Sequence, residues 1–157
     1  MRNVYELQSR WVLGANRETV WDGLEELLKS EDPMSWWPSV HVESRVGDDL
    51  NVRASSHLGY SLRFRIHDLT TDRPETMTVR SDGDLRGSGF LTFVDISSGR
   101  SAIDVQWNVS VDRRWMKATS WILRPAFGLG HRLVMSQGEK NLNRWLATRA
   151  TGSPRRR

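Results

Sequence analysis

The sequence predicts an α+β fold with a seven-stranded antiparallel sheet, two short helices after the first strand and a long C-terminal helix. Two observations predict this fold. Between residues 40 and 111 apolar and polar residues alternate, which is typical of half-buried strands. On both sides of this region apolar residues recur every three to four positions, which is typical of amphipathic helices.

The N-terminal region predicts the first strand and the two short helices. Residues 5–13 alternate loosely and indicate a strand. Asn16 offers an N-cap, and apolar residues then recur at helical spacing as far as Lys29, so a helix is expected. Residues 34–37 leave room for one further helical turn, which Pro38 ends.

Six more strands are expected in the alternating region, separated by turns rich in Gly, Asp and Pro. They cover residues 40–46, 50–58, 62–67, 77–79, 85–96 and 101–111. If the dipeptide at residues 98–99 forms the centre of the last turn, cross-strand pairing places Phe90 and Thr92 on the same face as Val105 and Trp107.

The last third of the chain predicts helical structure. Residues 115–123 are apolar and basic, and Pro125 interrupts the pattern before it resumes over residues 131–148. A helix of that length spans about 27 Å, which is enough to cross a small sheet. We expect a single domain over residues 1–150 and a disordered basic tail over residues 151–157.

Composition excludes several kinds of chemistry. The 157-residue chain has no cysteine, which rules out disulfides, thiolate nucleophiles and cysteine-ligated metals. Its four histidines form no metal-ligand motif and its glycines form no nucleotide-binding motif, so we expect no metal and no cofactor. No run is apolar enough to span a membrane and no secretory signal is present, so we expect a cytoplasmic protein.

The formal net charge of +4 conceals an uneven distribution. Residues 1–112 carry 12 Lys and Arg against 18 Asp and Glu, whereas residues 113–157 carry 11 against the single Glu139. A basic segment that packs on an acidic body explains this division better than nucleic-acid binding does. We therefore expect no nucleic-acid partner. A run of outward-facing arginines, Arg45, Arg53, Arg63 and Arg65, is expected to form a solvated sheet face.

The order of these elements resembles the helix-grip fold of the START-like (SRPBCC) superfamily, and the chain looks most like small bacterial polyketide cyclase/dehydrase proteins. Four short motifs carry the resemblance along nearly the whole chain. They are the helix entry at residues 15–21, the tryptophan pair before residue 40, the Gly-Ser-Gly at residues 87–89 and the helical pattern of residues 124–142.

The resemblance implies a curved sheet that grips the last helix around a cavity. Small residues where the two faces meet, such as Ala54, favour a cavity over an ordinary filled core. The expected ligand-binding residues are Trp37, Val42, Ser44, Ala54, Ser56, Leu62, Phe64, Met77, Phe90, Thr92, Trp107, Phe127, His131, Met135 and Gly138. Val79 and Val105 share the same faces.

We expect this cavity to bind a hydrophobic small molecule: a lipid, a polyketide or another aromatic or isoprenoid compound. One alternative is a polyketide cyclase/aromatase that acts on a poly-β-ketone, with His131 as the candidate for proton transfer. A second alternative is a lipid carrier that makes transient membrane contact through its basic C-terminal third. The sequence leaves the ligand and the oligomeric state open.

Overall fold

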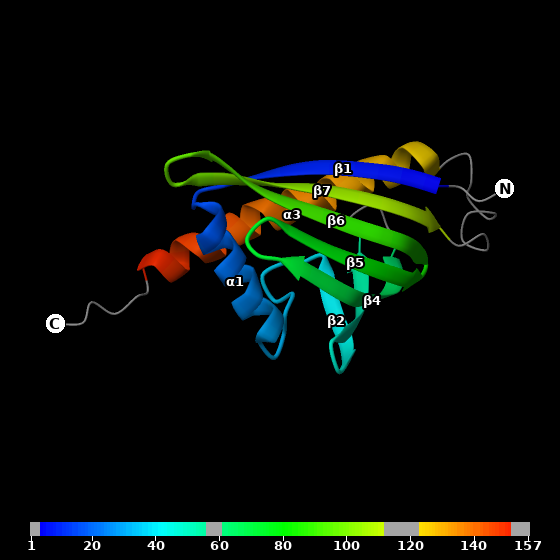
Figure 1. Ribbon diagram of the computed structural model, residues 1–157. Helices are drawn as coiled ribbons and strands as arrows, with labels where there is room; N and C mark the ends of the chain where they lie inside the picture. Colours follow the sequence, from blue (N-terminus) through cyan, green and yellow to red (C-terminus); the bar gives the residue numbers. More distant parts are fainter. Residues whose placement is uncertain (1–3, 56–60, 112–122, 152–157) are drawn as a thin grey trace.

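A computed structural model describes residues 4–55, 61–111 and 123–151 of the chain, which form one sheet and two helices (Figure 1). In chain order the elements are β1 (Val4–Leu13), α1 (Arg17–Lys29), β2 (Val40–Val46), β3 (Asp49–Ser55), β4 (Ser61–Asp72), β5 (Thr76–Gly83), β6 (Leu85–Ser97), β7 (Arg100–Val111) and α3 (Leu123–Thr151).

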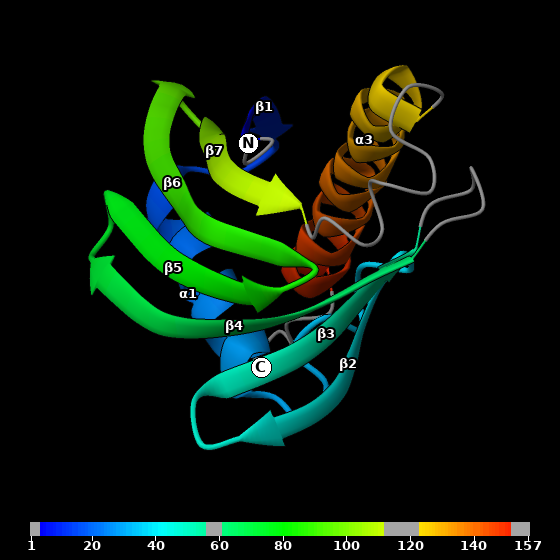
Figure 2. The ribbon, with the colours of Figure 1, turned by 90° about the vertical axis from the view of Figure 1, so that its right-hand side faces the viewer.

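The sheet has the order β1-β7-β6-β5-β4-β3-β2, and every neighbouring pair is antiparallel. It is curved, and α3 lies along its inner side (Figure 2). β1 and β2 are therefore the two edge strands. The predicted α+β class, the seven strands and the long C-terminal helix are confirmed.

The helices differ from the prediction at two places. Of the two short helices expected after β1 only α1 is present, and the segment that follows it consists of turns such as the one closed by the N–H of Trp37 and the carbonyl of Met34 (2.9 Å). Pro33 and Pro38 leave too few residues between them for a helix. α3 begins before Pro125, because a proline in the first turn removes no helical hydrogen bond.

Side chains of α3 bind the open edge of β1. The backbone N–H of Val12 donates to the carboxylate of Glu139 (2.8 Å), and the carbonyl of Val12 accepts from the side-chain amide of Asn143 (2.9 Å). The N–H of Gly14 donates to the side-chain oxygen of the same Asn143 (2.9 Å). Edge-strand groups that have no neighbouring strand thus find their partners on the helix.

A second set of contacts joins α3 to the entrance of β2, at the other edge. The side-chain oxygen of Gln137 accepts from both the N–H (2.9 Å) and the hydroxyl (2.5 Å) of Ser39. The indole N–H of Trp37 donates to the carbonyl of Val134 (2.9 Å). One helix is therefore hydrogen-bonded at both edges of the sheet.

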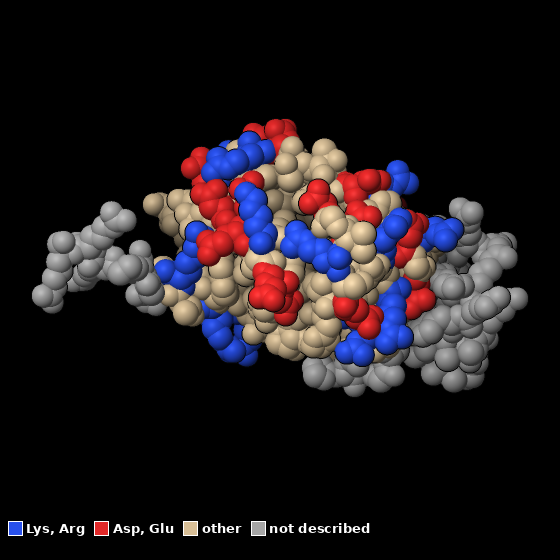
Figure 3. Space-filling view, turned by 90° about the horizontal axis from the view of Figure 1, so that it is seen from below, with Lys and Arg blue, Asp and Glu red and all other residues tan. Residues whose placement is uncertain are grey.

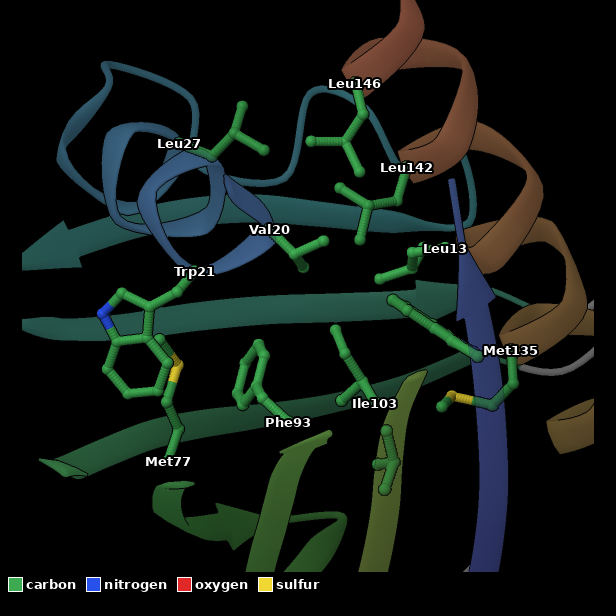
Figure 4. Close-up of a cluster of buried hydrophobic side chains, with 12 residues drawn as sticks. Leu13, Val20, Trp21, Leu27, Met77, Phe93, Ile103, Met135, Leu142 and Leu146 are labelled. Atoms are coloured by element: carbon green, nitrogen blue, oxygen red, sulfur yellow. The ribbon is translucent and has the colours of Figure 1, made fainter. Parts of the chain in front are cut away.

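The main hydrophobic core fills one end of the space between sheet and helices (Figure 4). Val20 and Trp21 of α1 meet Phe93 of β6, and Leu142 and Leu146 of α3 close the cluster. The ring of Trp21 packs edge-to-face against the ring of Phe93, with the ring centroids 4.9 Å apart. The cluster also includes Met135, so it extends along α3 from Leu146 to Met135.

Two bulges change the predicted strand register. In the β6–β7 pair Ser97 faces Arg100 but Asp95 faces Ser101, so Ile96 is an extra residue. Beyond this bulge the pairing is shifted by one residue, and Leu91 rather than Thr92 faces Val105. A one-residue shift moves every side chain of a strand to the opposite face.

The bulge in β2 has the same effect. Val42 faces Val52 and Ser44 faces Asn51, so Glu43 is the extra residue. Arg45 therefore pairs with Leu50 and turns to the inner side. The predicted outward position of Arg45 is wrong for this reason, whereas Arg63 lies outward and contacts Glu43 at 2.9 Å.

Positive and negative side chains are interspersed on the face seen from below (Figure 3). Arg65 lies between Asp49 (3.9 Å) and Asp82 (3.8 Å). The basic C-terminal helix makes one ion pair with α1 in the described part of the chain, between Arg149 and Glu26 (2.7 Å). Among the described residues, no helix is long and apolar enough to cross a membrane. Residues 152–157 of the predicted tail lie outside the described residues.

Replacing Glu139 tests the bond between α3 and the sheet edge. Glu139→Ala leaves the half-buried N–H of Val12 without its acceptor, so we expect the free energy of unfolding to fall by about 1–3 kcal/mol in urea denaturation. The exposed neighbour Lys140 supplies the control, and Lys140→Ala should change the value by less than about 0.5 kcal/mol. Equal effects of the two substitutions would contradict the assigned role of Glu139.

Candidate ligand cavity

A cavity of about 680 Å³ lies between the sheet and the N-terminal half of α3. This volume suits a drug-sized molecule. Its lining comes from the strands of the sheet, from α1 and the segment after it, and from about two turns of α3. Apolar side chains of the lining include Leu62, Phe64, Met77, Val79, Leu91, Ile103, Val105, Trp107, Val134 and Met135.

Eight of the predicted ligand-binding residues lie in this lining. They are Trp37, Ala54, Leu62, Phe64, Met77, Trp107, His131 and Met135. They come from five strands or turns that are far apart in sequence and from α3, and the fold brings them around one space. Ser56 lies outside the described residues, and so does the side chain of Phe127.

Phe90 and Thr92 were predicted on the inner face, and this placement is wrong. The bulge at Ile96 turns both side chains to the outer face, where Phe90 is 44% exposed. There they border a second, shallower hollow of about 340 Å³ with Gln8 and Gln106. The cavity receives Leu91 in their place.

Ser44, Val42 and Gly138 also lie away from the cavity lining. The bulge at Glu43 turns Ser44 outward, where its hydroxyl accepts from the side-chain amide of Asn51 (2.9 Å). Val42 packs into a small cluster at the β2 edge.

Gly138 opens no space toward a ligand, because tryptophan rings fill the space beside it. A Cβ at this position would lie 2.7 Å from the indole rings of both Trp11 and Trp37. The small residue therefore lets the two indoles pack directly against the helix backbone. The prediction that Gly138 lines the cavity is wrong.

Three further residues of the lining were not predicted from the sequence. They are Trp11, Leu91 and Trp36, which directly precedes Trp37. The strand alternation already placed Trp11 on the same face as Leu7 and Leu13, and that signal was sufficient to find it. Leu91 could be found only with knowledge of the bulge. No periodic pattern covers Trp36, which lies in a turn.

Three tryptophans form a rigid wall at one side of the cavity. Trp11 meets Trp37 edge-on with ring centroids 5.3 Å apart, and it meets Trp36 in the same way at 6.0 Å. Trp36 and Trp37 are stacked at 5.2 Å. Because each ring fixes the next, this wall presents a preformed aromatic surface to a ligand.

Charged side chains gather at the opening of the cavity. Lys29 at the end of α1, Arg45 and Asp48 at the β2–β3 turn and Asp68 in β4 border it, and all four are exposed. Arg45 is held there by the carbonyl of Gly47 (3.1 Å). Glu25 and Asp49 also belong to the lining, so acidic side chains outnumber basic ones there among the described residues.

His131 lies on α3 at the cavity and is substantially buried. Burial lowers the pKa of His131 from its ordinary value of 6.5 to about 4, because the cationic form loses its hydration. The imidazole is therefore neutral near pH 7. Its Nε2 atom is buried without a hydrogen-bond partner, and so is Nε1 of Trp11.

No group of three or more potential metal ligands occurs in the described part of the chain. His67 is close to two carboxylates, with Asp82 at 2.6 Å from Nε2 and Asp68 at 3.1 Å from Nδ1. Both ring nitrogens therefore have partners. The chemistry that the cavity offers consists of apolar contact and a few hydrogen bonds.

Comparison with solved structures gives close matches over nearly the whole chain. An aromatase/cyclase from Streptomyces sp. R1128 matches 94% of this chain and 96% of its own, with a TM-score of 0.69 and 12% identity. For a START superfamily protein from Mycobacterium smegmatis the match covers 91% of this chain and 97% of that protein, with a TM-score of 0.63 and 14% identity. The chain has the START-like helix-grip fold.

A norcoclaurine synthase from Thalictrum flavum shares this START-like fold, with a TM-score of 0.63, 11% identity and coverage of 96% of this chain and 98% of its own. No protein-family model and no curated protein sequence matches the chain. At these identities the likeness lies in the arrangement of sheet and helix. The cavity described above occupies the space between these two elements.

The buried histidine of this START-like fold makes stability depend on pH. The unfolded chain binds a proton at His131 below about pH 6.5, whereas the folded chain binds it only below about pH 4, so stability is complete above pH 6.5 and falls as the pH drops toward 4. We expect the free energy of unfolding of the wild type to fall by about 2 kcal/mol more than that of His131→Asn when the pH is lowered from 7 to 5. Urea denaturation at the two pH values measures this difference.

The exposed His41 provides the matched control for this measurement. His41→Asn should keep the wild-type loss of stability between pH 7 and pH 5. If His131→Asn and the wild type lose stability equally, the histidine is not buried as the structure places it.

Proposed function

We propose that this protein binds a hydrophobic small molecule, such as a lipid, a polyketide or another aromatic or isoprenoid compound, in the cavity between the sheet and α3. The observation that carries the proposal is the cavity itself. Its lining is dominated by apolar side chains, and part of that lining, such as Trp11, Met77 and Met135, also belongs to the hydrophobic core. A volume of about 680 Å³ that remains open among apolar side chains favours an apolar occupant.

The matched structures support the same proposal by their names. Two of them are aromatase/cyclases, and a norcoclaurine synthase is bound to dopamine and hydroxybenzaldehyde. Those proteins handle aromatic or ring-forming compounds. Because the START-like fold serves many ligands, we take from them only that this fold can hold a small aromatic molecule.

Filling the cavity should abolish binding without unfolding the protein. Ala54 lies in the lining on β3, and Ala54→Phe adds a ring that occupies ligand space. We expect native mass spectrometry of the freshly purified wild type to show a co-purified apolar molecule, and the variant to show less of it by tenfold or more. Thr92→Phe adds the same ring on the outer face and should retain the ligand.

Equal ligand content in wild type and Ala54→Phe would contradict binding in this cavity. If neither retains a molecule, binding of a fluorescent apolar probe gives the same comparison. Circular dichroism of each variant shows whether the fold is intact.

A polyketide cyclase/aromatase reaction is the second candidate, and His131 is the observation that favours it. Its Nε2 lies buried and without a partner at the cavity. Two features make this candidate weaker. Ser44 and Thr92, whose hydroxyls were expected to line the cavity, lie outside it. An imidazole with a pKa of about 4 is also a poor base at neutral pH.

Kinetics separate the two candidates. With a poly-β-ketone thioester as substrate, a binding protein should not change the rate or the products of spontaneous cyclisation. A general base at His131 would make the wild type faster than His131→Ala by about a hundredfold or more. That result would replace the binding proposal by the catalytic one.

The proposed lipid carrier that touches membranes depends on residues 115–124, whose side chains lie outside the described residues. Leu129 and Leu133 of α3 are exposed on either side of the exposed Arg132, which agrees with such a contact. This use of the C-terminal third stays a prediction from the sequence.

A further inference from the structure

Gly89 lies inside β6 on the inner side of the sheet, and it is buried. It pairs with Val79 of β5 on one side and with Trp107 of β7 on the other, and both of these residues line the cavity. A glycine inside a strand weakens the strand, because it has no side chain to pack and loses more conformational freedom on folding. A glycine at this place therefore needs a physical reason.

The backbone of residue 89 does not supply that reason. Among the described residues the glycines with a positive φ are Gly47, Gly83, Gly87 and Gly99, and Gly89 is not one of them. A residue with a side chain could therefore adopt the extended conformation of Gly89 without strain. The reason lies in what surrounds Gly89.

The indole of Trp107 occupies the place where a side chain at residue 89 would stand. A Cβ added to Gly89 would lie 2.9 Å from Cζ3, 3.0 Å from Cη2 and 3.1 Å from Cε3 of this indole. Carbon atoms in favourable contact lie about 3.5–4.0 Å apart, so even one added carbon displaces the ring. The six-membered ring of Trp107 thus covers the backbone of Gly89, and only a glycine leaves room for it there.

A displaced indole would move into the cavity. Trp107 is half-buried, and it belongs to the cavity lining. The backbone of β6 lies beneath its ring, and apolar side chains occupy neighbouring positions on the same side of the sheet. These neighbours are Leu7, Val79, Leu91, Val105 and Val109. The free direction for the ring is therefore away from the sheet, into the space that a ligand would use.

We propose that Gly89 is a specificity-determining residue that keeps the cavity deep enough for a large ligand by letting Trp107 lie against β6. The indole covers Gly89, so Gly89 acts on the ligand through Trp107 and is a positioning residue. The ligand class that needs this depth is a bulky apolar molecule with several rings. This inference rests on the proposed function, because it requires that the cavity holds a ligand.

Two rigid hydrocarbons of different size test the proposal. Naphthalene has two fused rings and pyrene has four, and neither carries a polar group. Titration followed by the fluorescence of each hydrocarbon gives its dissociation constant. We expect the wild type to bind pyrene about tenfold more tightly than naphthalene, because pyrene buries more apolar surface in a cavity that can hold it.

Substitutions at residue 89 should remove this preference. Gly89→Val raises the indole into the cavity and should lower the ratio of pyrene affinity to naphthalene affinity by about tenfold. Gly89→Ala adds a single carbon and should lower the ratio by about threefold, which keeps the test valid if Gly89→Val does not fold. Because both affinities are measured on the same variant, their ratio is insensitive to the fraction of unfolded protein.

Ser88→Val is the matched control for Gly89→Val. Ser88 precedes Gly89 in β6, and its side chain is exposed on the opposite side of the sheet. The control therefore adds a valine to the same strand without meeting Trp107. It should keep the affinity ratio of the wild type.

A double substitution shows whether Gly89 acts through Trp107. The leucine of Trp107→Leu is too short to cover residue 89, so nothing is left there for a new side chain to displace. In this background Gly89→Val should change the affinity ratio by less than about twofold.

The outcomes separate the inference from the proposed function. If the wild type binds both hydrocarbons equally, or if Gly89→Val and Gly89→Ala keep its ratio, Gly89 does not set the size of the ligand, although the cavity binds ligands. If Gly89→Val lowers the ratio equally in the wild type and in Trp107→Leu, the positioning of Trp107 is not the cause and the inference is wrong. If neither hydrocarbon binds the wild type, the proposed function fails and the inference fails with it.

Discussion

The hydrogen bonds that join α3 to both edges of the sheet are the constraint on which the rest of the structure depends. Glu139 and Asn143 satisfy backbone groups of β1, and Gln137 satisfies the N–H and hydroxyl of Ser39 before β2. These bonds fix the distance between the helix and the inner side of the sheet. A curved sheet held at both edges cannot flatten onto the helix, so the space between them persists even where side chains do not fill it.

Within that fixed space α3 contributes both to the hydrophobic core and to the cavity wall. Its C-terminal half carries Leu142 and Leu146 into the core with α1, and this supplies apolar burial that stabilises the fold. Its N-terminal half carries His131 and Met135 to the cavity wall. Met135 also belongs to the hydrophobic core, so stability and ligand binding share this part of the helix, and a change in the cavity can weaken the core.

Most of the fold could be predicted from the sequence, because period two, period 3.6 and turn residues are local signals. Consecutive antiparallel pairing accounts for the order from β7 to β2, whereas no local signal places β1 beside β7. Strand alternation indicated five of the lining residues: Ala54, Leu62, Phe64, Met77 and Trp107. The errors in the facing of strand residues have one physical cause. Ile96 and Glu43 are extra residues in their strands, and each bulge reverses the facing of the residues beyond it, which placed Phe90, Thr92 and Ser44 on the wrong side. The unpaired state of Trp11 depends on packing among distant residues, so no local pattern reveals it.

The cover that α3 gives to β1 also bears on how this protein avoids self-association. An uncovered edge strand is a template for pairing with another chain, and Val12 and Gly14 would offer such a template if Glu139 and Asn143 moved away. Moving the helix would expose the apolar cavity at the same moment. A ligand that passes through the charged opening leaves this edge protected, whereas a route that displaces the helix uncovers two aggregation-prone surfaces together.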